Sequence, residues 1–184
     1  FEASINEQTQ QLLNGITELG IFSVPIEHQD NFEVLFRRDE ELTAVFHKDS
    51  VFLEDGQKSV TLKDLEDVPL SLSSGCSEIV LKAFAQKSMV PRITCTSTTR
   101  STTLEWTRVK AAVSIVPVEE GEDLGEEFVA RPISDITADV YKTVVKVKDR
   151  PLSVAAQHFL KFYSKTRNSQ QVCDLDAILK SSNL

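Results

Sequence analysis

The sequence lacks any long hydrophobic run. A helix that spans a bilayer needs about 20 consecutive apolar residues, and no stretch of these 184 residues approaches that length. No signal-peptide pattern opens the chain. With 41% hydrophobic and 26% charged residues, the composition is that of an ordinary globular protein, large enough for one sizeable domain or two small lobes. We therefore expect no membrane partner.

Cysteine and histidine are also scarce. The three cysteines form an odd count without metal-type spacing: Cys76, Cys95 and Cys173. A disulfide framework is therefore not expected, which favours a reducing, cytoplasmic location. Cys76 would be a reactive thiol if it lay at a helix start, although a small, half-buried apolar role is the simpler interpretation. The three histidines lie far apart without an HExxH-like arrangement, so we expect no metal and no cofactor.

Basic charge and catalytic motifs are missing as well. The net charge of −8 argues against direct binding of nucleic acid, because duplex binding depends on neutralising phosphates. The sequence contains no Walker loop, GxGxxG, GxSxG elbow or HxE…CxxC pattern. Its acidic residues are concentrated in runs such as Glu119–Glu127, which are typical of solvated loops. We therefore expect no catalytic residue, and a binding module is favoured over an enzyme that acts on a small acidic substrate.

Strands and helices are predicted to alternate along the chain. Ser4 and Glu7 have capping-box spacing before an amphipathic segment, Gly15 suits the left-handed end of a helix, and Leu19–Val24 is apolar enough for a buried strand. Further strands are expected at residues 32–36, 42–46, 70–73, 93–96, 113–116, 128–133 and 140–147. Arg37–Glu41 is expected to be a charged turn. This alternation predicts an α/β protein with parallel pairing.

Further helices are expected after three of these strands and at the end of the chain. One follows Ser73, a second has Thr102 and Glu105 as a capping box and runs to about Lys110, and a third is capped by Ser153. A last short helix is expected from Gln170.

Three strand-to-helix junctions are rich in hydroxyl and amide side chains. They lie at Ser4–Gln8, Ser73–Ser77 and Thr96–Thr102. Ligands of open α/β sheets bind beyond the carboxyl ends of strands, where the free N–H groups of helix starts hold anions. Arg100 would supply a cation. The alternative is that these residues only cap helices, which Ser and Thr do in any protein.

The order of these motifs resembles the effector-binding domain of LysR-type transcriptional regulators. The family pattern "Q…L..G.lDlGi" is matched by Gln8–Ile21, with Glu18 in place of the usual Asp. The pattern "sl.dL...p" is matched by residues 60–70. The pattern "V..G.GI..lP" is matched by Val109–Pro117, without its two glycines. The pattern "s.aa..F..f" is matched by Ser153–Phe162. The resemblance covers most of residues 2–164.

The resemblance implies a periplasmic-binding-protein type II-like fold with two Rossmann-like lobes. Lobe I would contain residues 1–45 and 143–184, and lobe II residues 46–142. Two crossing strands, near Ala44–His47 and near Tyr141–Val145, would be the hinges. Because the family domain begins with a further strand and helix, preceded by a winged helix-turn-helix, we expect the chain to be truncated before Phe1.

The resemblance also implies a function. A small effector, a carboxylate or another small anion, would lie between the lobes and reposition the DNA-binding heads of a homodimer or tetramer. DNA would be contacted only through the absent N-terminal helix-turn-helix. The residues expected to contact the effector are Ser4, Ile5, Asn6, Gln8, Ser73, Ser74, Thr98, Thr99 and Arg100. The alternative on the same fold is an extracytoplasmic solute-binding protein of a transporter.

Overall fold

The chain divides into two compact units in the computed structural model, which describes residues 4–23, 29–52, 56–166 and 170–171. Of the described residues, unit 1 contains Ser4 and Glu40–Val140, and unit 2 contains Ile5–Asp39 and those from Tyr141 onward. The chain passes between them within strand β2 (Phe32–His47) and at the start of β7 (Val140–Val147). The lobe boundaries expected from the sequence, after residues 45 and 142, fall in the same two strands. None of the helices in the described ranges has the length and apolar character needed to span a bilayer.

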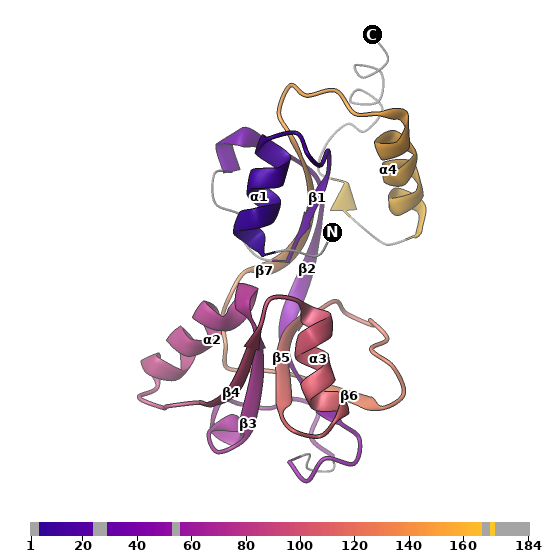
Figure 1. The fold of residues 1–184 in the computed structure, drawn as a ribbon. Helices are drawn as coiled ribbons and strands as arrows, with labels where there is room; N and C mark the ends of the chain where they lie inside the picture. Colours follow the sequence, from indigo (N-terminus) through magenta and orange to yellow (C-terminus); the bar gives the residue numbers. More distant parts are fainter. Residues whose placement is uncertain (1–3, 24–28, 53–55, 167–169, 172–184) are drawn as a thin grey trace. The chain divides into compact units, whose positions relative to one another are not determined.

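Unit 1 is a mixed sheet covered by two helices (Figure 1). Its strands are the second half of β2, β3 (Pro69–Ser73), β4 (Arg92–Ser97), β5 (Val113–Val118) and β6 (Phe128–Pro132). β3 is parallel to β4 and β5, whereas β2 is antiparallel to β5 and β6. Its helices are α2 (Ser74–Gln86), α3 (Arg100–Arg108) and the short 3-10 helix η2 (Lys63–Leu65).

The two helices of unit 1 cover opposite faces of its sheet. Leu70, Leu72 and Ile115 are buried in one cluster with Val80 and Phe84 of α2. The alternate residues of the same strands point to the other face. There, Val45, Val116 and Val118 form a second cluster against which Leu104 of α3 packs.

Hydroxyl groups attach α3 to the sheet. Thr103, Thr107 and Ser114 are fully buried. The Ser114 hydroxyl donates to the carbonyl of Thr103 at 2.7 Å and lies 2.6 Å from the hydroxyl of Thr107. Ser71 Oγ is also buried and has no hydrogen-bond partner within the described part of the chain. The α3 face of unit 1 is therefore partly polar, unlike the α2 face.

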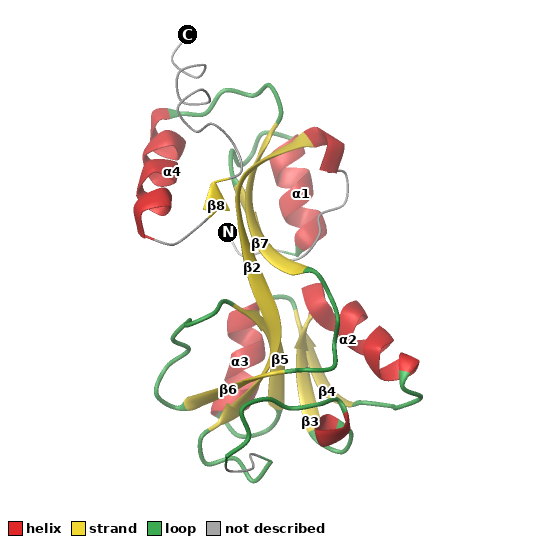
Figure 2. Ribbon diagram, turned by 180° about the vertical axis from the view of Figure 1, so that it is seen from behind, coloured by secondary structure: helices red, strands yellow, loops and turns green. Residues whose placement is uncertain are grey.

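Unit 2 is built on β1 (Gly20–Phe22), β7 and the first half of β2, which also pairs with β8 (Gln170–Gln171) (Figure 2). A short 3-10 helix, η1 (Gln29–Asn31), precedes β2. Val144 packs with Leu160 of α4 (Val154–Thr166), and Val145 packs with Leu12 of α1 (Ile5–Leu13). Because consecutive strand residues face opposite sides, α1 and α4 cover opposite faces.

The segment Gly15–Gly20, part of the family-like pattern, ties α1 to the start of α4. Gly15 has φ +72°, the left-handed conformation predicted for it. Arg150 donates to the last carbonyls of α1, at 2.7 Å to Leu12 O and 3.2 Å to Leu13 O. The Glu18 carboxylate accepts from Ser153 N and Ser153 Oγ, and Ser153 Oγ accepts from Ala156 N. The predicted cap by Ser153 is therefore confirmed.

The prediction of two strands around a charged turn at Arg37–Glu41 is wrong, because β2 is one continuous 16-residue strand. Neighbouring strands pair with it on either side of this segment and stabilise an extended backbone. Phe36 and Arg37 pair with β8, and Glu41 pairs with Val118 of β5. The Arg37 guanidinium lies 3.8 Å from the ring centre of Tyr141, so its charge has a cross-strand partner.

Three further expectations differ in detail. β5 runs through Pro117 to Val118 instead of ending at the proline. Among the described strands, β3 pairs in parallel with β4 and β5, whereas β1 with β7 and β2 with β5, β6 and β8 are antiparallel pairs. At the end of the chain, Gln170–Gln171 form strand β8, and the rest of the expected last helix lies outside the described residues.

Replacing Gly15 should destabilise the protein more than replacing Gly121. Both glycines have φ near +72°, but a Cβ at Gly15 would lie 3.1 Å from Arg150 Nη1, whereas one at Gly121 would meet nothing within 4 Å. Arg150 cannot move away without losing its bonds to α1. We expect G121A to cost about 1 kcal/mol for the backbone strain alone and G15A roughly 2 kcal/mol or more. Urea unfolding measures the stability of both variants. Equal losses would mean that Arg150 does not restrict the space beside Gly15.

Lys110 allows the opposite substitution, because here a residue other than glycine has the left-handed conformation. It follows α3 in the segment that lacks the two family glycines, and it has φ +61°. Its ammonium also pairs with Asp49 at 3.0 Å. Both K110G and K110A remove this ion pair, but only glycine relieves the left-handed strain. We expect K110G to be more stable than K110A by about 1 kcal/mol in urea unfolding. Equal stability of the two variants would mean that the conformation at residue 110 carries no strain.

Candidate functional site

Five of the residues predicted from the sequence meet at the carboxyl edge of β3 and β4. Ser73 ends β3 and is paired in register with Ser97, the last residue of the parallel strand β4. Helix α2 begins at Ser74, and α3 begins at Arg100 after Thr98 and Thr99. Two helix starts, with their free backbone N–H groups, therefore follow directly from neighbouring strand ends, which is an arrangement suited to an anion.

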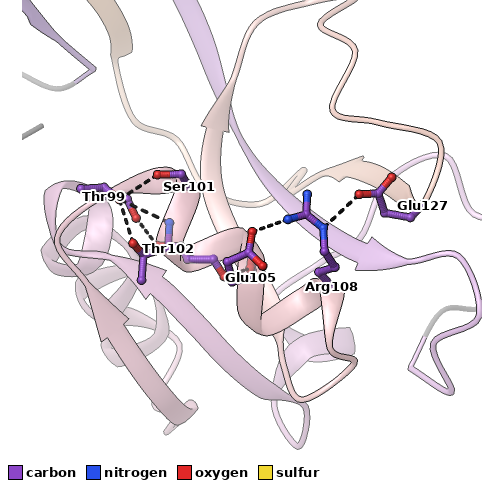
Figure 3. A network of polar contacts seen from close by, with 8 residues as sticks. Thr99, Ser101, Thr102, Glu105, Arg108 and Glu127 are labelled. Carbon is purple, nitrogen blue, oxygen red and sulfur yellow. Dashed lines mark hydrogen bonds and ion pairs between the residues drawn. The ribbon is translucent and has the colours of Figure 1, made fainter.

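The start of α3 is a small network of hydroxyl groups (Figure 3). Thr99 is the N-cap, and its hydroxyl accepts from Thr102 N at 3.3 Å. Thr99 Oγ1 also lies 3.0 Å from the hydroxyls of Ser101 and Thr102. The prediction of a capping box formed by Thr102 and Glu105 is therefore wrong: Glu105 pairs instead with Arg108, which also binds Glu127. The helix ends at Arg108, two residues before Lys110, near which its end was expected.

The start of α2 is organised differently, because its N-cap residue makes no side-chain capping bond. The Ser73 hydroxyl lies 3.1 Å from the Cys76 sulfur, which in turn lies 3.4 Å from the carbonyl of Ile115. Burial raises the pKa of the Cys76 thiol, and its hydrogen bonds with Ser73 oppose this only in part. Cys76 is fully buried. It is therefore a packed thiol and not a reactive thiolate, in agreement with the simpler interpretation of the sequence.

Arg100, the predicted cation, already has a carboxylate partner. Its Nη1 donates to both oxygens of Glu122, at 3.1 Å and 3.2 Å. Glu122 Oε2 also accepts from the backbone N–H of Glu119 at 3.2 Å. Sequence reasoning missed Glu122 because it lies in the acidic run that was interpreted as solvated. It also left Ser97 out of the site, although Ser97 belongs to a junction that the sequence singled out.

The remaining predicted residues lie at the other helix start. Ile5, Asn6 and Gln8 are in the first turns of α1, and Ser4 precedes them directly. Ile5 packs against the cluster of Leu12, which gives its side chain a role in the core of unit 2. Contact of these residues with the same ligand as Thr99 and Arg100 stays a prediction.

A hollow of about 460 Å³ also lies in unit 1. It is lined by Glu40, Glu41, Leu42, Pro132, Ile133, Ser134, Ile136, Thr137 and Ala138. None of the residues predicted for the site lines it. Among the described residues, no group of three or more His, Cys, Asp or Glu side chains is placed to hold a metal ion.

Comparison with known proteins identifies relatives of this fold. Residues 1–167 match the family model described as the LysR substrate binding domain. The structure is similar to the effector-binding domain of QuiR in complex with shikimate, with a TM-score of 0.69, 20% identity, and coverage of 90% of this chain and 81% of that one. It is also similar to the Synechocystis PCC6803 CcmR regulatory domain in complex with 2-PG, with a TM-score of 0.69, 17% identity and the same coverages.

A longer protein shows the same similarity. The LysR family transcriptional regulator CbnR matches with a TM-score of 0.66 and 21% identity over 89% of this chain. The chain spans only 58% of the length of that structure. No curated protein matches the sequence.

The buried Cys76 thiol predicts a loss of stability at high pH. Its pKa is raised in the folded protein, so above about pH 8.5 the unfolded chain loses a proton that the folded chain keeps. The free energy of unfolding should therefore fall as pH rises above that value, by up to about 1.4 kcal/mol per pH unit from this group. C76S, whose hydroxyl does not titrate there, is the control. Urea unfolding at about pH 8 and about pH 10 should show a steeper loss for the natural chain; parallel slopes would rule out this contribution.

Proposed function

The chain belongs to the LysR substrate binding domain family, which makes it a ligand-sensing regulatory domain, and we propose that its ligand is a small anionic metabolite. The observation that carries the proposal is the pairing of Ser73 with Ser97, which brings the starts of α2 and α3 to one sheet edge. Helix starts stabilise an anion through free N–H groups and the positive end of the helix dipole. Ser74 and Thr98 are exposed at this edge, where their hydroxyls can donate to a ligand.

The proposal also includes the residues predicted at the start of α1. Ile5, Asn6 and Gln8 lie in this helix and Ser4 precedes it, and we propose that these residues contact the ligand as well. A ligand that binds one arrangement of the lobes better than another shifts the population toward that arrangement. Two relatives support a small-molecule ligand, since QuiR binds shikimate and CcmR binds 2-PG in their structures.

The wider function is that of a transcriptional regulator. We propose that DNA is bound by a helix-turn-helix outside these 184 residues, in a cytoplasmic homodimer or tetramer. The CbnR regulator, which has been solved with its target DNA, supports this, and the chain spans 52% of that structure. The net charge of −8 fits a domain that does not itself bind the duplex. The family assignment favours this function over a transporter's solute-binding protein and over an enzyme.

Valine substitutions at Thr98 and Thr99 test the ligand site. Shikimate, 2-PG and sulfate are suitable probes, and a probe that binds should raise the melting temperature. T98V and T99V should each weaken its binding by up to about tenfold, the value of one lost hydrogen bond. T99S keeps the hydroxyl and is the control for Thr99. Because T99V also loses the helix cap, worth about 1 kcal/mol, affinity should be measured by calorimetry well below the melting temperature. Unchanged affinity in both valine variants would remove the site from α3.

A further inference from the structure

We propose that Glu122 is an internal carboxylate that pairs with the Arg100 guanidinium and thereby determines which ligand charges the site accepts. The inference rests on the proposed function, because it concerns the anion site at the start of α3. A ligand that uses the Arg100 guanidinium has to displace Glu122. A ligand that binds only through hydroxyl and backbone N–H groups leaves the ion pair in place.

The geometry of the pair supports this role. Arg100 is the first residue of α3, and Glu122 lies in the segment between β5 and β6. One guanidinium nitrogen contacts both carboxylate oxygens, at 3.1 Å and 3.2 Å. The side chains are only 27% and 24% exposed, so the pair is less screened than an ordinary surface ion pair. The carboxylate of Glu122 therefore neutralises the Arg100 guanidinium at this helix start.

Glu120 of the same acidic segment allows a matched comparison. Glu120 is exposed, and Glu119 contributes its backbone N–H to Glu122. Among the residues of this acidic segment, Glu122 is the one whose ion pair with Arg100 the structure shows. Removing Glu120 or Glu122 changes the net charge equally, but only the loss of Glu122 frees the guanidinium.

Arg100 also has unused hydrogen-bonding capacity. Its Nε is buried and lacks a hydrogen-bond partner within the described part of the chain. A buried donor without an acceptor is unfavourable, so an arrangement that satisfies it gains free energy. A guanidinium binds a planar carboxylate or a tetrahedral oxyanion through two N–H groups at once. An incoming oxyanion can therefore replace Glu122 with a bidentate contact that the internal carboxylate does not make.

This exchange, in which a ligand displaces Glu122 from Arg100, would make the site discriminate between ligands by their charge. With Glu122 in place, a second anion beside Arg100 meets a like charge, which weakens its binding. A dianion gains from Arg100 only after Glu122 has moved away. Glu122 therefore selects for ligands of low negative charge and is a specificity-determining residue, although it need not touch the ligand.

Sulfate binding to three variants tests the exchange. E122Q removes the competing charge and keeps the side-chain shape, E120Q removes the same charge from the same segment, and E122Q combined with R100Q removes both partners. Affinity is measured by calorimetry on the 184-residue chain at constant ionic strength. We expect E122Q to bind sulfate about tenfold more tightly than the natural chain, E120Q to change affinity by less than about twofold, and the double variant to lose the gain. E122A serves as a second variant if E122Q is poorly folded.

Other outcomes would overturn the exchange. Equal gains in E122Q and E120Q would mean a general charge effect. Weaker binding in E122Q would mean that Glu122 positions Arg100 for the ligand. An absence of sulfate binding in every variant would mean that Arg100 is closed to anions. The proposed function is judged separately. If E122Q binds sulfate more tightly and T98V and T99V bind as the natural chain does, the displacement of Glu122 is supported and the hydroxyl site is removed. If T98V and T99V weaken metabolite binding and E122Q changes nothing, the hydroxyl site is supported and the displacement of Glu122 is removed.

Discussion

The register of β2 is the constraint on which the rest of the structure depends. This one strand supplies a ladder partner to unit 2 through its first half and to unit 1 through its second half. Ala44 belongs to the cluster on the α2 face, and its neighbour Val45 belongs to the cluster on the α3 face. A slip by one residue would exchange these faces and bring the wrong side chains into both cores. The pairing of Ala44 with Ile115 and Arg131 therefore fixes the sheet edge that carries the candidate site.

Three buried hydroxyl side chains under α3 link that sheet to the start of the helix: Ser114 of β5 and Thr103 and Thr107 of α3. Hydrogen bonds are directional, whereas apolar contacts tolerate sliding, so the bonds of Ser114 to Thr103 and Thr107 fix α3 along its own axis. The N-cap Thr99 and the first helical residue, Arg100, are held in place by contacts about one and two turns further along the helix. A second helix of the same unit, α2, packs through Val80 and Phe84, and its polar contact with β5 is the weaker one of the Cys76 thiol with the carbonyl of Ile115 at 3.4 Å. These hydrogen bonds thus give the candidate site a fixed position at the cost of polar groups in the core.

Sequence reasoning succeeded where the cause of structure is local. The left-handed Gly15, the cap by Ser153 and the strand that ends at Ser73 each depend on a few adjacent residues. It failed for β2, because partner strands far along the chain keep the charged segment extended. It failed for Glu122 for the same reason, since Arg100 lies 22 residues away. A charged run is usually solvated, and the exposed Glu120 obeys that rule while Glu122 does not.

The family-like pattern and the candidate ligand site involve different residues of this chain. The family-like segment Gly15–Gly20 has a structural explanation: Gly15 leaves room for Arg150, and Glu18 caps α4 through Ser153. Neither residue needs a ligand to account for it. Solved structures that share only 17–20% identity with this chain share the fold, and those of QuiR and CcmR hold different ligands, shikimate and 2-PG. The proposed ligand contacts lie instead among the polar residues at the starts of α2 and α3, and in our proposal the Arg100–Glu122 pair makes this site sensitive to the charge of the ligand.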